Sequence, residues 1–301
     1  MRRRWRFPVA LLALLGAVGG CRAAPAPHRA EQTIRIGAYD STENQVLAAV
    51  YAEGARREGL RVSLRSANGP RDGLASALEQ GVVDLVVDGA GTALGLTGSD
   101  RTAVPGTREG LHDALRQRFD GRGISVLDVG FAEGHSGVAV STAFAAAHHL
   151  SRVSDLVPLA GALTFGGPPG CGQSPLCLAG LGRVYGLRFG AVRTVPAGAA
   201  TAGALTSGQI QVGLLDSTDA WLSAAPVTLL TDDKALEPPE NIVPLVRADA
   251  LRGGSGDRLR AVVNTISQRL STADLVQLDR SVEIDGLTPE QAAVRWWDEF
   301  E

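Results

Sequence analysis

The chain contains three cysteines, and their surroundings indicate two kinds of thiol chemistry. Cys21 follows a stretch with four arginines in its first six residues and an apolar run over residues 9–18, which is too short to span a bilayer. Gly19 and Gly20 separate that run from the cysteine. A basic start, a short apolar run and a small-residue end are typical of a secretory signal peptide. The sequence therefore predicts a signal peptide over residues 1–20 and a mature chain that works outside the cytoplasm.

The segment Val18-Gly19-Gly20-Cys21 resembles the bacterial lipobox, in which the cysteine thiol is acylated and becomes the mature N-terminus. The resemblance implies that Cys21 is lipidated. Each acyl chain adds about 0.8 kcal/mol of membrane affinity per buried methylene, so an acylated cysteine would hold a soluble domain at a membrane. Residues 21–32, rich in alanine and proline, then form a lipid-anchored, flexible linker. Ordinary secretion with cleavage after Ala24 is the alternative.

Cys171 and Cys177 lie close together in a loop rich in glycine and proline. In an oxidising compartment such a pair favours a disulfide. Metal binding is the alternative, but it needs further cysteine or histidine ligands at suitable spacing, and the sequence shows no such set. We therefore expect a Cys171–Cys177 disulfide that makes its loop rigid, and we expect neither a metal site nor another cofactor.

Catalytic and nucleic-acid-binding signatures are missing from the sequence. An extracytoplasmic hydrolase would need a nucleophile beside a base, yet no Gly-x-Ser-x-Gly elbow occurs and no Ser/His/Asp set follows strand ends. The formal net charge is −3, and without the four leader arginines the rest of the chain stands at −7. Nucleic-acid-binding proteins normally carry a basic footprint. The sequence therefore favours a binding protein that is no enzyme and has no nucleic-acid partner.

The candidate residues need a fold to position them, and the chain pattern predicts an α/β fold. From Thr33 onward, short aliphatic runs alternate with helical patterns, which indicates two sheets, mixed or parallel, flanked by helices. Strands are expected at residues 33–37, 61–66, 82–87, 124–129, 138–140, 163–165, 189–192, 211–215, 227–230 and 242–246. Helices are expected after a capping box at Thr42, at 71–80, around Leu111 to Phe119, and at 257–270, 271–279 and 288–300. Two such α/β units bind ligands between them, at the carboxyl ends of strands.

Motifs spread over the whole mature chain resemble one family. They are Ile34-Arg35-Ile36-Gly37, Asp84-Leu85 with Gly91-Thr92-Ala93-Leu94, Leu163-Thr164-Phe165-Gly166-Gly167-Pro168-Pro169, Val184-Tyr185-Gly186-Leu187, Gly208-Gln209-Ile210-Gln211-Val212, Ser217-Thr218-Asp219, and Leu230-Thr231-Asp232-Asp233-Lys234. Their order is similar to that in the glycine betaine/carnitine/choline (osmoprotectant) class of ABC-transporter substrate-binding lipoproteins. The resemblance implies a bilobed Venus-flytrap fold of the type II periplasmic-binding-protein kind. Such a protein captures a small osmoprotectant between two lobes and delivers it to a permease.

The resemblance also implies a domain organisation and a set of partners. The chain would cross between lobes twice, near Gly134-His135 and near residues 233–239. Lobe 1 would then be residues 33–134 plus 241–301, and lobe 2 residues 135–240. We expect a monomer whose partners are a small polar solute such as a quaternary ammonium, an ABC permease, and the membrane reached through the lipid anchor.

Ligand contacts are expected where the family motifs face the cleft. A quaternary ammonium cannot donate a hydrogen bond, so aromatic faces hold it, whereas a carboxylate is held by Arg, Lys or backbone amides. Tyr39 matches a cleft-facing position, and Trp221 is the other aromatic candidate. Asp88 either opposes a cation or caps the following helix. The further candidates are Ser41, Thr92, His135, Ser136, Ser174, Ser217 and Thr218. The alternative for these hydroxyls is to satisfy backbone amides in turns, and for His135 to be a solvated hinge residue.

The chain departs from the family pattern in two places. The family often carries tyrosines in the stretch occupied here by residues 86–90, where this chain has none, and commonly an arginine at the position of Ser174. Of the three tyrosines, Tyr51 and Tyr185 are expected in the core, so a complete tyrosine cage cannot form. The expected ligand therefore differs from betaine. The alternative is a bilobed receptor that no longer captures a solute and acts on another membrane protein.

Overall fold

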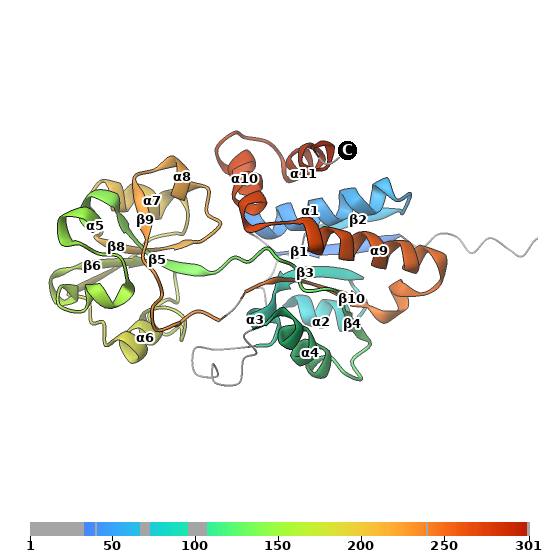
Figure 1. Ribbon diagram of the computed structural model, residues 1–301, viewed down its shortest axis with the longest axis horizontal. Helices are drawn as coiled ribbons and strands as arrows, with labels where there is room; N and C mark the ends of the chain where they lie inside the picture. Colours follow the sequence, from blue (N-terminus) through green and yellow to red (C-terminus); the bar gives the residue numbers. More distant parts are fainter. Residues whose placement is uncertain (1–32, 40, 67–72, 96–106, 239, 300–301) are drawn as a thin grey trace, which may run out of the picture. The chain divides into compact units, whose positions relative to one another are not determined.

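The computed structural model describes residues 33–39, 41–66, 73–95, 107–238 and 240–299. Two five-stranded sheets form the centre of this part of the chain. The predicted signal peptide and the linker with Cys21 lie outside the described residues. Both sheets are mixed and flanked by helices, in agreement with the predicted fold class (Figure 1).

The first sheet has the strand order β2-β1-β3-β10-β4. Its strands are β1 (Ile34–Ala38), β2 (Val62–Ser66), β3 (Leu85–Gly89), β4 (Ile124–Val126) and β10 (Ile242–Arg247). β1 runs parallel to β2 and β3, whereas β10 runs antiparallel to β3 and β4. β10 enters this sheet directly from a connecting segment without a crossover helix, so nothing obliges it to run parallel to its neighbours.

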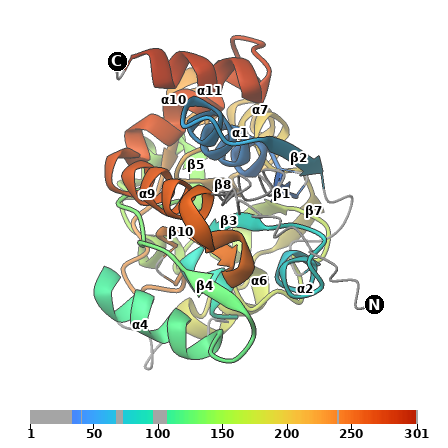
Figure 2. The ribbon, with the colours of Figure 1, turned by 90° about the vertical axis from the view of Figure 1, so that its right-hand side faces the viewer.

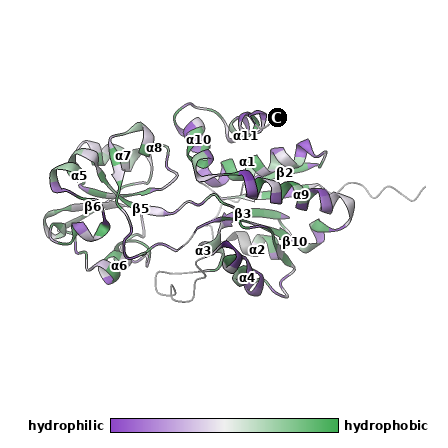
Figure 3. Cartoon of the chain, in the orientation of Figure 1, coloured by the Kyte–Doolittle hydropathy of each residue, from purple (hydrophilic) through white to green (hydrophobic). Residues whose placement is uncertain are grey.

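Helices cover both faces of the first sheet (Figures 1 and 2). Leu85 and Val87 of β3 pack with α1 (Thr42–Arg57), α9 (Gly253–Arg269), α10 (Thr272–Glu283) and α11 (Pro289–Asp298) in one core. Val86 points the other way, into a core with α2 (Gly73–Glu79) and α4 (Arg108–Arg118). This alternation follows from the two-residue period of a strand. Figure 3 shows the apolar colouring of β3 and β10 beside the mixed surfaces of α4 and α9.

The ion pair of Arg35 and Asp84 ties β1 to the start of β3. Asp84 is fully buried, and its two carboxylate oxygens accept from Nε and Nη2 of Arg35, both at 2.8 Å. The backbone N–H of Arg35 also donates to Asp84, at 3.0 Å. β3 begins at Leu85, three residues later than predicted, because Val82 lies exposed in the turn before it.

The second sheet has the strand order β7-β6-β8-β5-β9. Its strands are β5 (Ser136–Ser141), β6 (Thr164–Gly167), β7 (Ala191–Thr194), β8 (Val212–Asp216) and β9 (Val227–Leu229). β6 pairs in parallel with β7 and β8, and β5 pairs antiparallel with β8 and β9. Its helices are α5 (Thr142–His148), α6 (Leu178–Gly180), α7 (Ala199–Thr206) and α8 (Trp221–Ala224). All five strands were predicted, but α6, α7 and α8 were not.

The chain passes from the first sheet to the second and back through two connecting segments. Glu133 on the outgoing segment and Asn241 on the returning one form an antiparallel bridge. Beside it, the N–H of Gly134 donates to the carbonyl of Glu240 at 3.3 Å. The two segments thus run side by side at this bridge, which lies next to the crossings predicted near Gly134-His135 and residues 233–239 (Figure 1).

Helix starts and buried tyrosines test the local predictions. The capping boxes at Ser271 and Thr288 are confirmed as the starts of α10 and α11. The start of α1 was predicted one residue too late, because Ser41 is the N-cap and its Oγ accepts from the N–H of Asn44 at 3.2 Å. Tyr51 and Tyr185 are buried, as predicted, with 1% and 3% of their surface exposed.

Candidate solute-binding site

Segments that follow strands of both sheets line one cavity of about 710 Å³. The first sheet contributes Tyr39 and Ser41, between β1 and α1, and Thr92 in α3 (Ala90–Ala93). The second sheet contributes the loop of residues 168–177 and the turn after β8. The outgoing and returning connecting segments and α10 complete the wall. This volume lies within the range of small-molecule sites in proteins.

Seven of the ten predicted ligand residues line this cavity. They are Tyr39, Ser41, Thr92, His135, Ser136, Ser174 and Thr218. Asp88, Ser217 and Trp221 are not part of its wall. That any of the ten contacts a solute stays a prediction.

Three of the lining hydroxyls donate to carboxylates of the same cavity. The pairs are Thr92 Oγ1 to Glu240 Oε1 at 2.8 Å, Ser136 Oγ to Asp216 Oδ1 at 2.7 Å, and Thr218 Oγ1 to Glu43 Oε2. The third pair joins the turn after β8 to the first turn of α1, across 175 positions of sequence. These hydroxyls therefore fix the orientation of carboxylates in the cavity wall.

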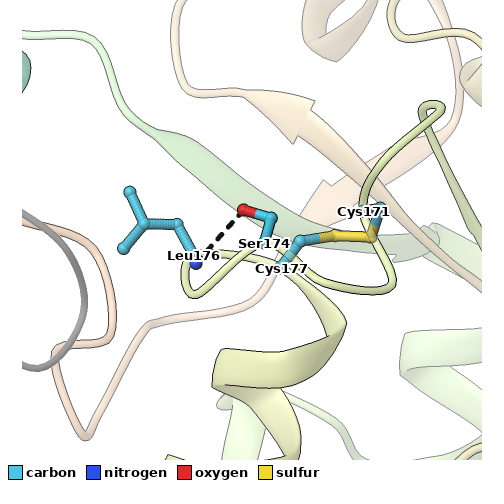
Figure 4. Close-up of a disulfide and its surroundings, with 4 residues drawn as sticks. All are labelled: Cys171, Ser174, Leu176 and Cys177. Atoms are coloured by element: carbon cyan, nitrogen blue, oxygen red, sulfur yellow. Dashed lines mark hydrogen bonds between the residues drawn. A yellow bond between two sulfur atoms is a disulfide. The ribbon is translucent and has the colours of Figure 1, made fainter.

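The disulfide between Cys171 and Cys177 is confirmed, with a Cα–Cα distance of 5.2 Å. Both cysteines are buried and both contribute to the cavity wall. Ser174 lies in the loop that this bond closes, and its Oγ accepts from the N–H of Leu176 at 3.3 Å (Figure 4). The disulfide thus fixes a segment of the cavity wall. In this segment Ser174 stands where the resembling family commonly has an arginine.

The three candidates outside the wall have partners within the protein. Asp88 is buried in β3, and its Oδ1 accepts from the N–H of Gly89 at 2.9 Å. Ser217 Oγ accepts from the N–H of His135 at 3.1 Å. Trp221 begins α8 and packs at the edge of the core between the second sheet and α7.

The most prominent feature of the wall is its negative charge, which was not predicted from the sequence. Seven carboxylate side chains line the cavity: Glu43, Asp216, Asp219, Glu237, Glu240, Asp279 and Glu283. Among the described residues of the wall there is neither lysine nor arginine, and Tyr39 is the one aromatic side chain. The only acid proposed from sequence, Asp88, is not among the seven. The net charge of −7 indicated an excess of acidic residues, but it did not indicate which of them line the cavity.

Asp279 is the most unusual member of this group. Its side chain is 4% exposed, and its Oδ1 has no hydrogen-bond partner in the described part of the chain. Burial, and then the negative charges of Glu43, Glu283, Asp219 and Asp216, raise its pKa to about 9. This carboxyl is therefore protonated at neutral pH, and a cation in the cavity would favour its ionisation.

Asp219 shows the same effect more weakly. Burial is the main reason that its pKa rises to about 6, and nearby Glu283 and Asp216 add to it. These carboxylates come from separate elements of the wall, namely α1, β8 with the turn after it, and α10. No group of three or more His, Cys, Asp or Glu side chains within the described ranges could hold a metal ion.

A comparison with protein families decides what kind of protein has this site. Residues 32–299 match the family described as the substrate-binding domain of ABC-type glycine betaine transport systems. The chain belongs to this family. Members of this substrate-binding family serve ABC importers on the outer side of the cytoplasmic membrane and are not enzymes.

Individual relatives of the family agree with this assignment. The chain is 26% identical to the carnitine transport binding protein OpuCC of Listeria monocytogenes over 302 aligned positions, covering 96% of this chain and 92% of that protein. The crystal structure of a glycine betaine/carnitine/choline ABC transporter protein covers 88% of this chain and 98% of its own, with 22% identity and a TM-score of 0.76. A choline-binding ABC-transporter protein in complex with choline covers 89% of this chain and 88% of its own, with 14% identity and a TM-score of 0.62. These structures share the type II periplasmic-binding-protein fold with this chain.

The described helices include none that is both long and apolar enough to cross a membrane.

Proposed function

We propose that this protein is the solute receptor of an ABC importer and that it captures a small organic cation in the cavity described above. The observation that carries the proposal is the wall itself, with seven carboxylates and, within its described residues, no lysine or arginine. Relatives in the family bear the names of carnitine, choline and glycine betaine binding proteins. All three solutes carry a quaternary ammonium, so a cationic ligand agrees with the family.

The charge of the wall favours a solute that lacks a carboxylate. The carboxylate of glycine betaine or carnitine would enter a cavity whose ionisable groups are nearly all acids. Two like charges 4 Å apart repel by about 4 kcal/mol at an effective dielectric constant of 20. Ser174 stands where an arginine would have offered a counter-charge. Choline, which has the same trimethylammonium group and no carboxylate, should therefore bind more tightly than glycine betaine.

The test is calorimetric titration of the purified protein with choline, glycine betaine, carnitine, proline betaine and ectoine. We expect choline to bind at least ten times more tightly than glycine betaine, and saturating choline to raise the melting temperature. Glycine betaine binding as tightly as choline would refute the preference for a carboxylate-free cation. Binding of no organic cation would favour the alternative receptor that acts on another membrane protein.

The finer parts of the proposal concern the anchor and the hinge. Acylated Cys21 would tether the receptor to the outer face of the membrane. Residues 33–134 plus 241–301 would form one lobe and residues 135–240 the other, in a monomer hinged at the paired segments around Glu133 and Asn241. Cell fractionation tests the anchor, since a Cys21→Ala variant should move from the membrane to the soluble fraction. Continued membrane retention of this variant would argue against lipidation.

A further inference from the structure

Resting on the proposed function, a narrower assignment concerns the class of cation. We propose that the cavity takes a linear di- or polyamine in its protonated form, whose N–H groups bond the wall carboxylates, in preference to a quaternary ammonium. The nitrogens of both classes are positively charged, but only those of a protonated amine can donate a hydrogen bond. The wall of this cavity distinguishes between them.

Aromatic faces for a quaternary ammonium are scarce. Such a nitrogen, shielded by methyl groups, is held through cation–π contacts with several rings. Tyr39 is the single aromatic side chain among the described wall residues, and it is half-buried against the core beneath the first sheet. One ring cannot enclose a trimethylammonium group.

Hydrogen-bond acceptors, in contrast, are abundant, and one of them lacks a donor. Asp279 is 96% buried, and its Oδ1 has no partner in the described structure. Leaving a buried polar atom unpaired is costly, whereas a charge-assisted hydrogen bond to it is strong. A primary ammonium supplies up to three N–H donors to such an oxygen and its neighbours. A trimethylammonium supplies none and would leave Oδ1 unsatisfied.

The distribution of the carboxylates favours more than one cationic nitrogen. They come from separate elements of the cavity wall: Glu43 from α1, Asp216 and Asp219 from β8 and the turn after it, and Asp279 and Glu283 from α10. No described cluster of three is compact enough for a metal ion. Several carboxylates that act on Asp279 within one cavity are balanced better by a molecule with two or more positive charges than by one with a single charge.

Proton exchange provides a second readout of the same site. The groups that act on Asp279 are Glu43 from α1, Asp216 and Asp219 from the second sheet, and Glu283 from its own helix. Arg280 follows Asp279 in the chain, and its Nη1 donates to Ser223 Oγ at 3.1 Å. His135 lies in the wall of the same cavity. An ammonium at Asp279 would ionise this carboxyl, so amine binding should release a proton below about pH 9.

The experiment compares putrescine with its hexamethylated analogue, tetramethylene-bis(trimethylammonium). Both have two charges on the same four-carbon spacer, but only putrescine has N–H groups. We expect the purified full chain to bind putrescine or spermidine at least ten times more tightly than the methylated analogue, by calorimetry at about pH 7.5. Equal or tighter binding of the analogue overturns the inference. If choline binds and the amines do not, this inference fails while the proposed function stands; if no cation binds, both fail.

Variants locate the amine within the cavity. Asp279→Asn, which is nearly isosteric, should weaken putrescine binding at least tenfold and reduce the proton release seen when the titration is repeated in buffers of different ionisation enthalpy. Glu283→Gln, at the exposed end of α10, serves as a second variant that leaves the core untouched. Asp285→Asn makes the same change of charge two residues beyond the helix, outside the wall, and should bind putrescine like the wild type. Wild-type affinity in both Asp279→Asn and Glu283→Gln would overturn the assignment.

Discussion

Asp279 should make the ligand-free protein less stable as the pH rises, and replacing it with asparagine should remove this effect. The pKa of its carboxyl is raised from 3.8 to about 9 in the folded state, chiefly by burial. Between these two values the folded protein keeps a proton that the unfolded chain has lost. Stability therefore falls as the pH rises through this window, is unaffected by this group below it, and levels off above about pH 9.

The magnitude follows from the one proton that is bound. Within the window, the free energy of unfolding falls by about 1.4 kcal/mol per pH unit. Asp219, whose pKa is raised to about 6, contributes little above that value. From about pH 6.5 to about pH 8.5, the raised pKa of Asp279 alone should thus lower the free energy of unfolding by about 2.7 kcal/mol. For a chain of this size, this loss corresponds to a fall of about 5–10 °C in melting temperature. Asp279→Asn cannot ionise, so its stability advantage over the wild type should grow by that amount.

The assay is urea unfolding of the wild type, Asp279→Asn and Asp285→Asn in the same buffers across this pH range. The difference in the free energy of unfolding between the wild type and Asp279→Asn cancels the contributions of the groups that the two proteins share. Asp285→Asn controls for the change in net charge and should follow the wild type. Parallel stability curves for the wild type and Asp279→Asn would refute the reasoning, because they would mean that this carboxyl ionises alike in the folded and unfolded states.

Two further predictions concern packing and charge, and urea unfolding checks both. A Cβ at Gly54, inside α1, would clash with Trp297 Cζ2. Gly54→Ala should therefore lower the free energy of unfolding by about 1–3 kcal/mol. Gly203→Ala in α7, where a Cβ meets no atom within 4 Å, should instead stabilise by about 0.5–1 kcal/mol, and equal effects at the two sites would contradict the packing argument. Arg35→Met should lower the free energy of unfolding by about 2–3 kcal/mol because it removes the guanidinium that bonds both oxygens of buried Asp84, and Arg35→Lys should cost less. An Arg35→Met protein as stable as the wild type would show that water or Arg247 replaces the lost partner.

The sequence predicted the local structure well because its signals are local. Aliphatic runs marked all ten strands, and the Ser271 and Thr288 boxes marked the starts of two helices. Short helices such as α6 and α8 were missed, since they are too short to show a helical period. The strand β3 was predicted too early because Val82 and Val83 extend its apolar run into the preceding turn.

Predictions for the site were less complete. The family motifs led to residues that share one cavity, since Thr92, Ser136 and Thr218 all line it. The same hydroxyls, however, donate to carboxylates that the sequence had not singled out. The sequence does not indicate whether an acidic side chain faces solvent or lines a cavity with other acids, and most acidic side chains face solvent.

By itself, the sequence determined the ten described strands, the longer helices, the disulfide in its Gly/Pro loop and the family, because each depends on residues close together in the chain or on motifs in a fixed order. Only the tertiary structure decided the character of the binding site. Glu43, Asp216 and Asp279 meet because the chain leaves the first sheet, builds the second and returns through paired segments. Burial and mutual repulsion then change the protonation of these carboxyls, and both effects depend on distances in space that the order of residues does not reveal.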